Sequence, residues 1–503
     1  MELETHLEKH FGYQSFRTGQ KEVISSILAG QHTLAMLPTG TGKSLCYQLP
    51  GYLLKGQILI VSPLLSLMQD QVDQMKLLGE KRVVALNSFL SPSDRNYVLR
   101  HLHEYKFIFI SPEMLRVPFI IRMLQQLTIS LFVVDEAHCI SQWGFDFRPD
   151  YSKLGEIREK LGGPLTLALT ATATEKVRED IAASLGINEI KRIESTIDRP
   201  NIAFYVDELS SYHEKENRVL ELVSRLQKPG IIYFSSKKAA EQVAALLTEK
   251  GICEALPYHG GLEQNTRILI QQQFIHNQID VICATSAFGM GVNKENIRFI
   301  IHFHLPMQIE SYLQEVGRAG RDGLPSVAIL LYSSGDEQLP MQLAESELPT
   351  EQQIDWLFSK LQDEQIQGND GKFDLGFQLA ETGGFSEIQW RIMKGFVNHP
   401  TSEDSNLEAL KLSLKDFVKG RLAVKINNIV RMKKLVEIST CRREFLLQYF
   451  DERLINKIPS CCDNCGLELS TYQTSKTTSL SRGKCEDWKD YLSKILINRE
   501  LRE

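Results

Sequence analysis

The sequence predicts an α/β protein made of two parallel-sheet lobes followed by a helical C-terminal region. Short, nearly continuous apolar runs alternate with stretches long enough for helices, a pattern typical of parallel strands that are buried on both faces. The runs form two sets, and the Asp-Arg-Pro-Asn turn signal within 197–201 indicates a linker between them. Beyond residue 334 the strand-like runs give way to helical patterns, which indicate a third, helical region.

Each set of runs supplies the strands of one predicted lobe. Several runs end in Ser, Thr or Asp. Because the carboxyl ends of parallel strands form the binding crevice of an open α/β sheet, these polar ends predict a functional site at that edge. The first set is 32–37, 57–62, 107–111, 131–135 and 165–170, and the second is 231–236, 281–286, 298–304 and 327–333.

Length and composition are those of an ordinary globular protein. The 503 residues predict about three domains at roughly 100–200 residues each. No apolar stretch approaches the roughly 18 uncharged residues that span a bilayer, and the charged N-terminal segment lacks the apolar core of a signal peptide. We therefore expect a cytoplasmic protein, nucleoid-associated if bacterial, without membrane contact. In that reducing compartment its nine cysteines would serve as metal ligands and core residues rather than as disulfides.

The net charge of −6 argues against a passive nucleic-acid coat, which is usually basic, but not against a motor that must release its track. The charge is unevenly spread, because the stretch from residue 411 to 456 contains eleven Lys and Arg but five Asp and Glu. This basic stretch is either a nucleic-acid contact or, more commonly for such runs, a solvated helical face.

A phosphate-binding loop follows the first predicted strand. Its glycines allow successive backbone N–H groups to point at phosphate oxygens, and the next helix adds its positive N-terminal end. Lys43 would reach the β- and γ-phosphates, and the Ser44 hydroxyl would hold Mg²⁺. A strict P-loop has Gly where this chain has Leu37. The predicted loop is Pro38, Thr39, Gly40, Thr41, Gly42, Lys43 and Ser44.

An acidic pair at the end of run 131–135 supplies the second part of the site. Asp135, at the strand tip, can coordinate Mg²⁺ through water, and Glu136 can orient and deprotonate the attacking water. His138, in the same Asp-Glu-Ala-His segment, would signal the nucleotide state to its neighbours. The four-residue match is weak alone and gains its specificity from the phosphate loop upstream.

Two arginines in the second lobe complete the predicted ATP site. Arg318 and Arg321 lie three residues apart among glycines, and such a pair suits an arginine finger that stabilises transition-state charge. Because the finger and the phosphate loop belong to different lobes, hydrolysis would require the lobes to close. ATP binding and product release would then drive closing and opening.

The phosphate loop, Asp-Glu-Ala-His and Gln-x-x-Gly-Arg-x-Gly-Arg occur in the order found in superfamily 2 helicases, and three further segments resemble the RecQ family. The first, 11–20, resembles the adenine-recognising motif of that family. The resemblance implies that Tyr13 and Arg17 stack around the base while Gln20 hydrogen-bonds its edge. The alternative is an aromatic helix that packs into the core.

The second segment, 141–151, directly follows Asp-Glu-Ala-His and resembles the aromatic-rich loop of RecQ helicases. Bases stack on aromatic faces for about 1–3 kcal/mol each. We therefore expect Trp143 and Phe147 to sense single-stranded DNA, with Arg148 in the link back to the ATP site. Phe145 stands where the family usually has His, a departure from the pattern at a coupling position.

The third segment is a set of cysteines near the end of the helical region. Four thiolates from a helix end and a Cys-Cys-x-x-Cys knuckle suit tetrahedral Zn²⁺, although adjacent ligands are less usual than Cys-x-x-Cys. The resemblance to the RecQ zinc module implies a Zn²⁺ site, and the alternative is a set of unconnected reduced thiols. The cysteines are Cys441, Cys461, Cys462 and Cys465.

The resemblance also implies a domain order. We expect RecA-like lobes over 1–197 and 198–338, a zinc-binding helical domain of the RecQ type over 416–470, and a tail over 471–503. The segment 339–415 is either a winged-helix-like insertion or a plain helical spacer. Because only 38 residues follow Cys465, the chain resembles a short-form RecQ without the usual full accessory domains.

The hypothesis that results is an ATP- and Mg²⁺-dependent DNA helicase that holds Zn²⁺. The resemblance implies 3′-to-5′ movement on single-stranded DNA, forked or tailed duplex substrates, and a role in recombination and repair. We expect a monomer that meets single-strand-binding or recombination proteins. One alternative is a DEAH-type RNA helicase, against which the aromatic loop and the cysteines argue. The other is a DNA-binding scaffold that only senses nucleotide, which Glu136 and Arg321 disfavour.

Overall fold

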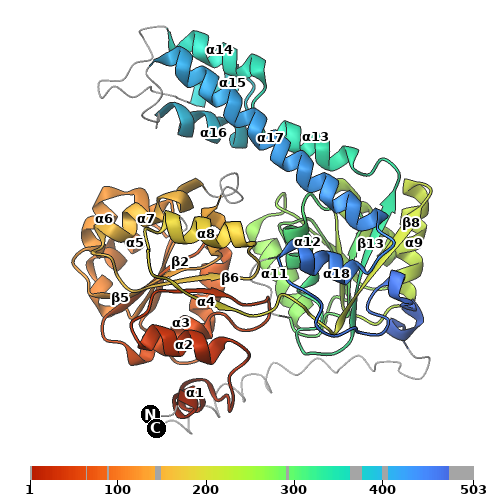
Figure 1. Cartoon of the computed structure of the whole chain (residues 1–503), viewed down its shortest axis with the longest axis horizontal. Helices are drawn as coiled ribbons and strands as arrows, with labels where there is room; N and C mark the ends of the chain where they lie inside the picture. Colours follow the sequence, from red (N-terminus) through yellow and green to blue (C-terminus); the bar gives the residue numbers. More distant parts are fainter. Residues whose placement is uncertain are drawn as a thin grey trace.

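The computed structural model describes residues 3–63, 65–87, 90–141, 149–289, 294–362, 377–398 and 406–474. Two α/β lobes lie side by side, and a long helix rises from the second lobe to a group of smaller helices above the first (Figure 1). Within the described segments, no helix combines the length and the apolar character that a membrane span requires.

The first lobe contains a seven-stranded sheet in which all neighbouring strands are parallel. The strand order is β3-β4-β2-β5-β6-β1-β7. The strands are β1 (Thr33–Met36), β2 (Gln57–Val61), β3 (Val83–Leu86), β4 (Phe107–Ile110), β5 (Ile129–Val134), β6 (Thr166–Thr170) and β7 (Lys191–Glu194).

Helices cover both faces of this sheet. Apolar side chains of α2, α3 and α4 form a core against one face, and those of α5 to α8 form a core against the other. Helix α1 packs on α3. The helices are α1 (Leu3–Phe11), α2 (Gln20–Leu28), α3 (Leu45–Leu53), α4 (Leu65–Leu77), α5 (Pro92–Arg100), α6 (Pro118–Leu124), α7 (Leu154–Lys160) and α8 (Glu175–Ser184).

The second lobe contains a six-stranded parallel sheet of order β10-β11-β9-β12-β13-β8. Helices α9 and α10 cover one face, while α11, α12 and parts of α17 and α18 cover the other. The strands are β8 (Ile202–Leu209), β9 (Gly230–Tyr233), β10 (Ala255–Tyr258), β11 (Val281–Ala284), β12 (Phe299–His302) and β13 (Ser326–Ser333). The helices are α9 (Tyr212–Arg225), α10 (Lys237–Glu249), α11 (Gln264–Ile275) and α12 (Ile309–Val316).

All nine predicted strands are present, with ends displaced by three residues at most, and all nine are interior strands. The sequence does not predict β3, β7, β8 or β10, which are the four edge strands. An interior strand is apolar on both faces, whereas an edge strand tolerates polar residues and proline. Strand β7 accordingly reads Lys-Arg-Ile-Glu, and β10 contains Pro257.

The region beyond the second lobe is helical in its described segments. Helix α17 runs unbroken through residues 415 and 416, so the expected domain boundary there lies inside a helix. No strand occurs within 339–362, 377–398 or 406–415, so these segments contain no wing of a winged-helix fold. The helices are α13 (Gln338–Ser346), α14 (Glu351–Leu361), α15 (Phe377–Thr382), α16 (Glu387–Asn398), α17 (Leu407–Glu437) and α18 (Arg442–Tyr449).

Five lysines of the basic stretch 411–456 are paired with acidic side chains of neighbouring helices. Lys411 and Lys415 both contact the Asp355 carboxylate of α14, at 2.9 and 2.7 Å. These pairs argue against a free cationic surface, but the face is only partly solvated, because the Lys415 and Lys425 side chains are 18% and 13% exposed. The other pairs are Lys419–Glu351, Lys425–Glu347 and Lys433–Glu337.

Candidate active site

The predicted phosphate loop connects β1 to α3. Gly40 and Gly42 adopt left-handed backbone conformations, with φ of +85° and +74°, which residues with a Cβ rarely adopt. Helix α3 begins at Leu45, so its free N–H groups and the positive end of its dipole directly follow the loop. Residues 38–44 therefore have the strand–loop–helix setting that phosphate binding needs.

Gln20 of α2 holds this loop from behind. Its side-chain amide nitrogen donates to the carbonyl oxygens of Thr41 (2.7 Å) and Gly42 (3.1 Å). Within a trans peptide unit the N–H points away from the C=O, so the N–H groups of Gly42 and Lys43 point away from Gln20. Gln20 thus fixes the direction of two N–H groups in the phosphate loop.

Two of the three residues assigned to the adenine base, Arg17 and Gln20, contact the same loop. The Arg17 guanidinium donates to the Gly40 carbonyl oxygen, and the Arg17 backbone N–H donates to Gln20 Oε1 at 2.9 Å. Gln20 Oε1 has a second lone pair, although the residue is 3% exposed and its amide nitrogen is used on the loop. The Tyr13 ring is 59% exposed and is open to a stacking partner.

The acidic pair follows the end of β5. In the sheet, β6 lies between β5 and β1, the strand that leads into the phosphate loop. Burial and repulsion from Glu136 raise the pKa of Asp135 to about 7, while the charge of Lys43 acts to lower it. Glu136 is buried and has a left-handed backbone with φ of +47°, a conformation that is uncommon outside glycine and is concentrated at functional sites. Two carboxylates so placed favour a cation between them and the loop.

His138 connects the acidic pair to the next strand. Its Nδ1 lies 3.1 Å from the Thr170 hydroxyl at the end of β6 and 3.4 Å from Glu136 Oε2. Burial lowers the pKa of His138, so the ring tends towards its neutral form. The sequence shows Thr170 only as the end of the predicted run 165–170, and its contact with His138 requires the tertiary structure.

The arginine loop, defined here as residues 317–323, lies directly on the phosphate loop. The Thr39 hydroxyl donates to the Gly317 carbonyl oxygen at 3.0 Å. A Cβ placed on Gly40 would lie 2.9 Å from Cγ of Arg321, so the stem of that arginine covers the phosphate loop. The two predicted halves of the site, which lie on different lobes, are therefore in contact.

The two arginines have different surroundings. Arg318 is buried and donates to the Gly289 carbonyl oxygen within the second lobe. Burial and the nearby charges of Arg318 and Arg199 lower the pKa of Arg321 to about 10, so its guanidinium still carries a charge at neutral pH. Of the two, Arg321 is the one that lies against the phosphate loop.

The linker contributes a residue that the sequence does not single out. Arg199 donates from Nη1 to the carbonyl oxygens of Thr39 and Gly317, both at 3.2 Å, and from Nη2 to those of Ala319 (3.1 Å) and Gly320 (2.7 Å). The sequence shows this residue only as part of a turn signal, because the spacing of a linker carries no information about which carbonyls lie near it.

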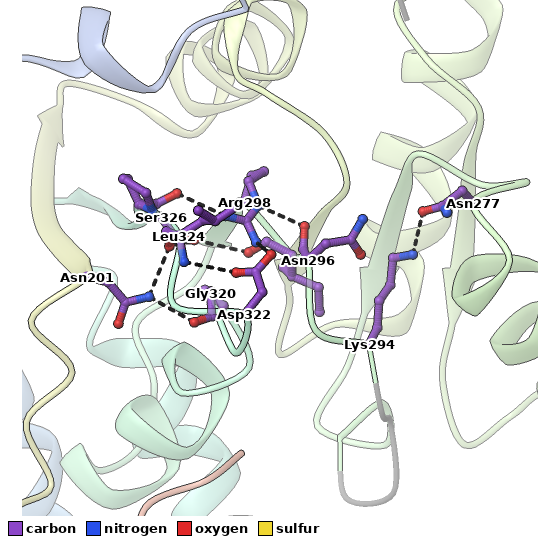
Figure 2. Close-up of polar contacts among 12 residues, drawn as sticks. Asn201, Asn277, Lys294, Asn296, Arg298, Gly320, Asp322, Leu324 and Ser326 are labelled. Carbon is purple, nitrogen blue, oxygen red and sulfur yellow. Dashed lines mark hydrogen bonds and ion pairs between the residues drawn. The ribbon is translucent and has the colours of Figure 1, made fainter. Parts of the chain in front are cut away.

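A second set of polar contacts shapes the arginine loop from the side of the second lobe (Figure 2). Asn201 donates to the carbonyl oxygens of Gly320 (2.8 Å) and Leu324 (3.0 Å), and Arg298 pairs with the Asp322 carboxylate. Further along the same lobe, Lys294 donates to Asn277 at 2.7 Å. The arginine loop is therefore also held by contacts within its own lobe.

The phosphate loop, the linker and the arginine loop together line a cleft of about 620 Å³ between the lobes. Three arginines line this cleft. One precedes α2, one belongs to the linker and one to the arginine loop. The carboxylates of Asp198, Glu295 and Asp322 also line the cleft, so the groups that suit an anionic ligand are the phosphate loop and the Arg321 side chain rather than the net charge of the cleft. The arginines are Arg17, Arg199 and Arg321.

The four predicted cysteines converge in the C-terminal region. One sulfur from each lies within 4.8 Å of the others, and the sulfurs of Cys441 and Cys461 are 3.5 Å apart. Four thiolates about 2.3 Å from one zinc ion would lie roughly 3.8 Å apart, so the set fits this metal. Arg442 pairs with the Asp463 carboxylate through two hydrogen bonds of 2.7 and 2.6 Å, which ties α18 to the Cys-Cys-x-x-Cys knuckle.

The aromatic loop with Trp143, Phe147 and Arg148 lies outside the described residues. The residues on either side of this loop are described, and they hydrogen-bond to the Asp-Glu-Ala-His segment. The Ser141 hydroxyl donates to the His138 carbonyl oxygen at 3.0 Å, and the Tyr151 hydroxyl donates to the Asp135 carbonyl oxygen at 3.0 Å.

Comparison with known families gives three matches along the chain. The DEAD/DEAH box helicase model matches residues 17–181, and the helicase conserved C-terminal domain matches 214–323. The RecQ zinc-binding model matches 413–466, which includes all four cysteines.

Individual relatives agree with these matches. The chain is 46% identical over 98% of its length to the probable ATP-dependent DNA helicase RecS of Bacillus subtilis, and the match covers 97% of that protein. It is 42% identical over 66% of its length to the ATP-dependent DNA helicase RecQ of Haemophilus influenzae, of which it covers 53%.

Solved structures share the fold at lower identity. The helicase Lhr of Mycobacterium smegmatis, bound to single-stranded DNA and AMP-PNP, matches with a TM-score of 0.55 and 21% identity, covering 66% of this chain and 47% of Lhr. Dbp5 of S. cerevisiae, bound to RNA, matches with a TM-score of 0.53 and 18% identity, covering 66% and 88%. DNA and RNA helicases thus share this architecture, and the sequence relatives rather than the fold distinguish them. By these relatives and by its zinc-binding match, the chain belongs to the RecQ family of superfamily 2 ATP-dependent DNA helicases.

Proposed function

We propose that the chain hydrolyses ATP in the cleft between its lobes and uses lobe closure and opening to move 3′ to 5′ along single-stranded DNA. The observation that carries the proposal is the contact of Arg321 and Gly317 with the phosphate loop. A site completed by both lobes ties hydrolysis to their relative movement. In recombination and repair, forked or tailed duplexes would be its substrates.

Each residue of the phosphate side has a proposed role. Lys43 would contact the β- and γ-phosphates, while Ser44 and Asp135 would hold Mg²⁺, which when bound offsets phosphate charge. Glu136 would orient and deprotonate the attacking water. Its buried Oε2 forms no hydrogen bond among the described residues and has His138 Nδ1 3.4 Å away, so this oxygen would take the proton of the water. His138 would report the nucleotide state to β6.

The opposite side of the cleft would bind the base and the developing charge. Arg318 and Arg321 would stabilise the transition state, because a guanidinium that is held in place before the reaction costs no reorganisation as charge develops. Tyr13 and Arg17 would stack on the adenine, with Gln20 Oε1 as an acceptor for its exocyclic amine.

The DNA contacts and the zinc site are proposed from the family. Trp143 and Phe147 would stack on bases of single-stranded DNA, with Arg148 as the link to the ATP site. The cysteines at 441, 461, 462 and 465 would hold Zn²⁺ as a structural ion, whose binding energy is folding energy for the surrounding helices.

The deciding experiment measures ATP hydrolysis without nucleic acid, with single-stranded DNA and with RNA, and unwinding of duplexes with a 3′ or a 5′ tail. We expect hydrolysis to be stimulated by DNA more than by RNA and unwinding only with the 3′ tail. A preference for RNA would favour an RNA helicase. Absence of turnover with either nucleic acid would favour a nucleotide-sensing scaffold.

A further inference from the structure

The linker between the lobes, residues 195–201, is fastened to the C-terminal region. The buried guanidinium of Arg443, on α18, donates to the Asp198 carboxylate and to the carbonyl oxygens of Arg199 (3.1 Å) and Ile202. Its plane also lies over the Phe204 ring, 5.2 Å from the centroid. Arg443 therefore fixes both a side chain and the main chain of the linker.

The turn after α18 holds the other end of the linker. The Glu452 carboxylate accepts hydrogen bonds from the Thr196 hydroxyl (2.6 Å) and the Ile197 backbone N–H (3.0 Å). Together with Arg443, this turn contacts the linker at four successive residues, from 196 to 199. These contacts couple the linker to α18 and to the turn that follows it.

The side chain of Arg199 joins the two halves of the ATP site. Its two terminal nitrogens carry four hydrogens, and these bond one carbonyl of the phosphate loop and three of the arginine loop. The guanidinium is thus committed to protein carbonyls rather than to a ligand. The three arginine-loop carbonyls follow the C-terminal end of α12, where the helix dipole favours a cation.

The same elements meet around a small cavity. Its walls come from the phosphate loop, the linker, α12 and α18. Because all four elements line the same cavity, a displacement of α18 would change the packing against the phosphate loop. The lining includes Thr39, Asp198, Leu313, Arg443 and Leu446.

We propose that Arg199 is a positioning residue for ATP hydrolysis and that Arg443 acts through it. Arg199 holds the arginine loop on the phosphate loop, and Arg443 holds the main chain of Arg199. The cysteine-bearing region would then set how far the lobes close. This inference rests on the proposed ATPase function.

The first test replaces Arg199 by lysine, which keeps the charge but lacks the planar fork of donors. The kcat for DNA-stimulated hydrolysis should fall roughly tenfold or more, while the KM for ATP changes less than about threefold, because the phosphate loop itself is intact. Dyes attached through unnatural amino acids at the exposed positions of Lys81 and Lys250, one on each lobe, should show less closure with AMP-PNP by energy transfer. A merely structural role would lower the amount of active protein and leave the closure of the folded fraction unchanged.

The second test asks whether the two arginines act in series. Arg443→Lys should lower kcat less than Arg199→Lys, and the double variant should match Arg199→Lys within about twofold, because residues in one chain of contacts are not additive. Losses that multiply would overturn the link. Glu452→Gln, on the exposed turn, decides the matter if Arg443→Lys fails to fold, and it too should reduce closure. Arg453→Lys, an exposed neighbour of Glu452, should leave kcat and closure unchanged.

The proposed function and the positioning role of Arg199 are contradicted by different results. If the unmodified chain hydrolyses no ATP with DNA, the proposed function is wrong. If the unmodified chain is active and Arg199→Lys retains full kcat and closure, only the positioning role is wrong.

Discussion

The hydroxyl of Thr39 donates a 3.0 Å hydrogen bond to the carbonyl oxygen of Gly317, 278 residues further along the chain. A Cβ on Gly317 would lie 2.1 Å from that hydroxyl oxygen. Thr39 belongs to the phosphate loop of one lobe and Gly317 to the arginine loop of the other. This hydrogen bond therefore forms only when the two loops are in contact, as the proposed ATP hydrolysis requires.

Gly317→Ala should oppose closure with little effect on the fold. The backbone of Gly317 is helical, so alanine is tolerated there, but its methyl group would collide with Thr39. We expect kcat to fall roughly tenfold while nucleotide binding persists. Gly420→Ala, in a helix with open space around it, should keep full activity and gain at most about 1 kcal/mol of stability. Full kcat in Gly317→Ala would contradict the importance of the contact.

Lys43→Ala should abolish ATP hydrolysis and leave binding to single-stranded DNA largely intact. Lys43 is proposed to contact the phosphates, whereas the DNA contacts are expected elsewhere. Turnover should drop by at least about 100-fold, as expected for a loss of transition-state charge stabilisation. Fluorescence anisotropy with labelled DNA checks the binding, and exposed Lys55→Ala is the matched control. Hydrolysis that survives in Lys43→Ala would place the nucleotide elsewhere.

Asp70, which lies at a contact between the lobes, should make the free energy of unfolding depend on pH. Burial raises the pKa of Asp70 to about 6, and Gln271 of the other lobe donates to its carboxylate at 3.4 Å. The folded state favours the protonated form, so this contribution to stability is present below the unfolded pKa and is lost as pH rises through about 6.

Asp70→Asn should therefore be more stable than the unmodified chain at pH 8, by roughly 1 kcal/mol after allowance for solvent screening. The advantage should vanish near pH 4. Thermal unfolding at both pH values measures it, and Asp73→Asn, exposed on the same helix, should show no such pH-dependent gain. Equal stability of Asp70→Asn and the unmodified chain at pH 8 would refute the burial argument.

Cys441→Ser should remove bound zinc and destabilise the C-terminal region. A structural metal contributes folding energy, so losing one of four ligands should cost more than about 2 kcal/mol. Metal analysis and thermal unfolding with and without a chelator test this. Cys253→Ser, a half-buried thiol in the second lobe, should retain the metal. A metal-free but equally stable unmodified chain would contradict a zinc site.

Trp143→Ala should uncouple ATP hydrolysis from DNA. Stacking contributes about 1–3 kcal/mol per base, so without this surface DNA should no longer raise kcat. Hydrolysis without DNA should stay within about twofold, because the substitution leaves the proposed ATP site unchanged. Tyr97→Ala, which removes an exposed aromatic ring from α5, is the control. A Trp143→Ala variant that DNA still stimulates fully would remove the assigned role of this loop.

The sequence predicts the interior of both sheets better than their edges. Strand β12 is detected because Phe-Ile-Ile-His is buried on both faces, whereas β7 is missed because an edge strand can carry Lys, Arg and Glu. The same limit explains the helical region. Local patterns indicate its helices, but only the structure shows that α17 crosses the expected boundary and that Lys411 and Lys415 pair with Asp355.

By itself, the sequence determined the two-lobed α/β architecture, the phosphate loop, the acidic pair, the arginine pair and the cysteine set, because each is a local arrangement of residue types with its own chemistry. Tertiary structure alone decided that Gln20 supports the phosphate loop and that Arg199 joins Thr39 to the arginine loop. Both side chains bond backbone carbonyls. Every residue has such a carbonyl, so no residue type in the sequence marks the partner, and only the folding of distant segments brings donor and acceptor together.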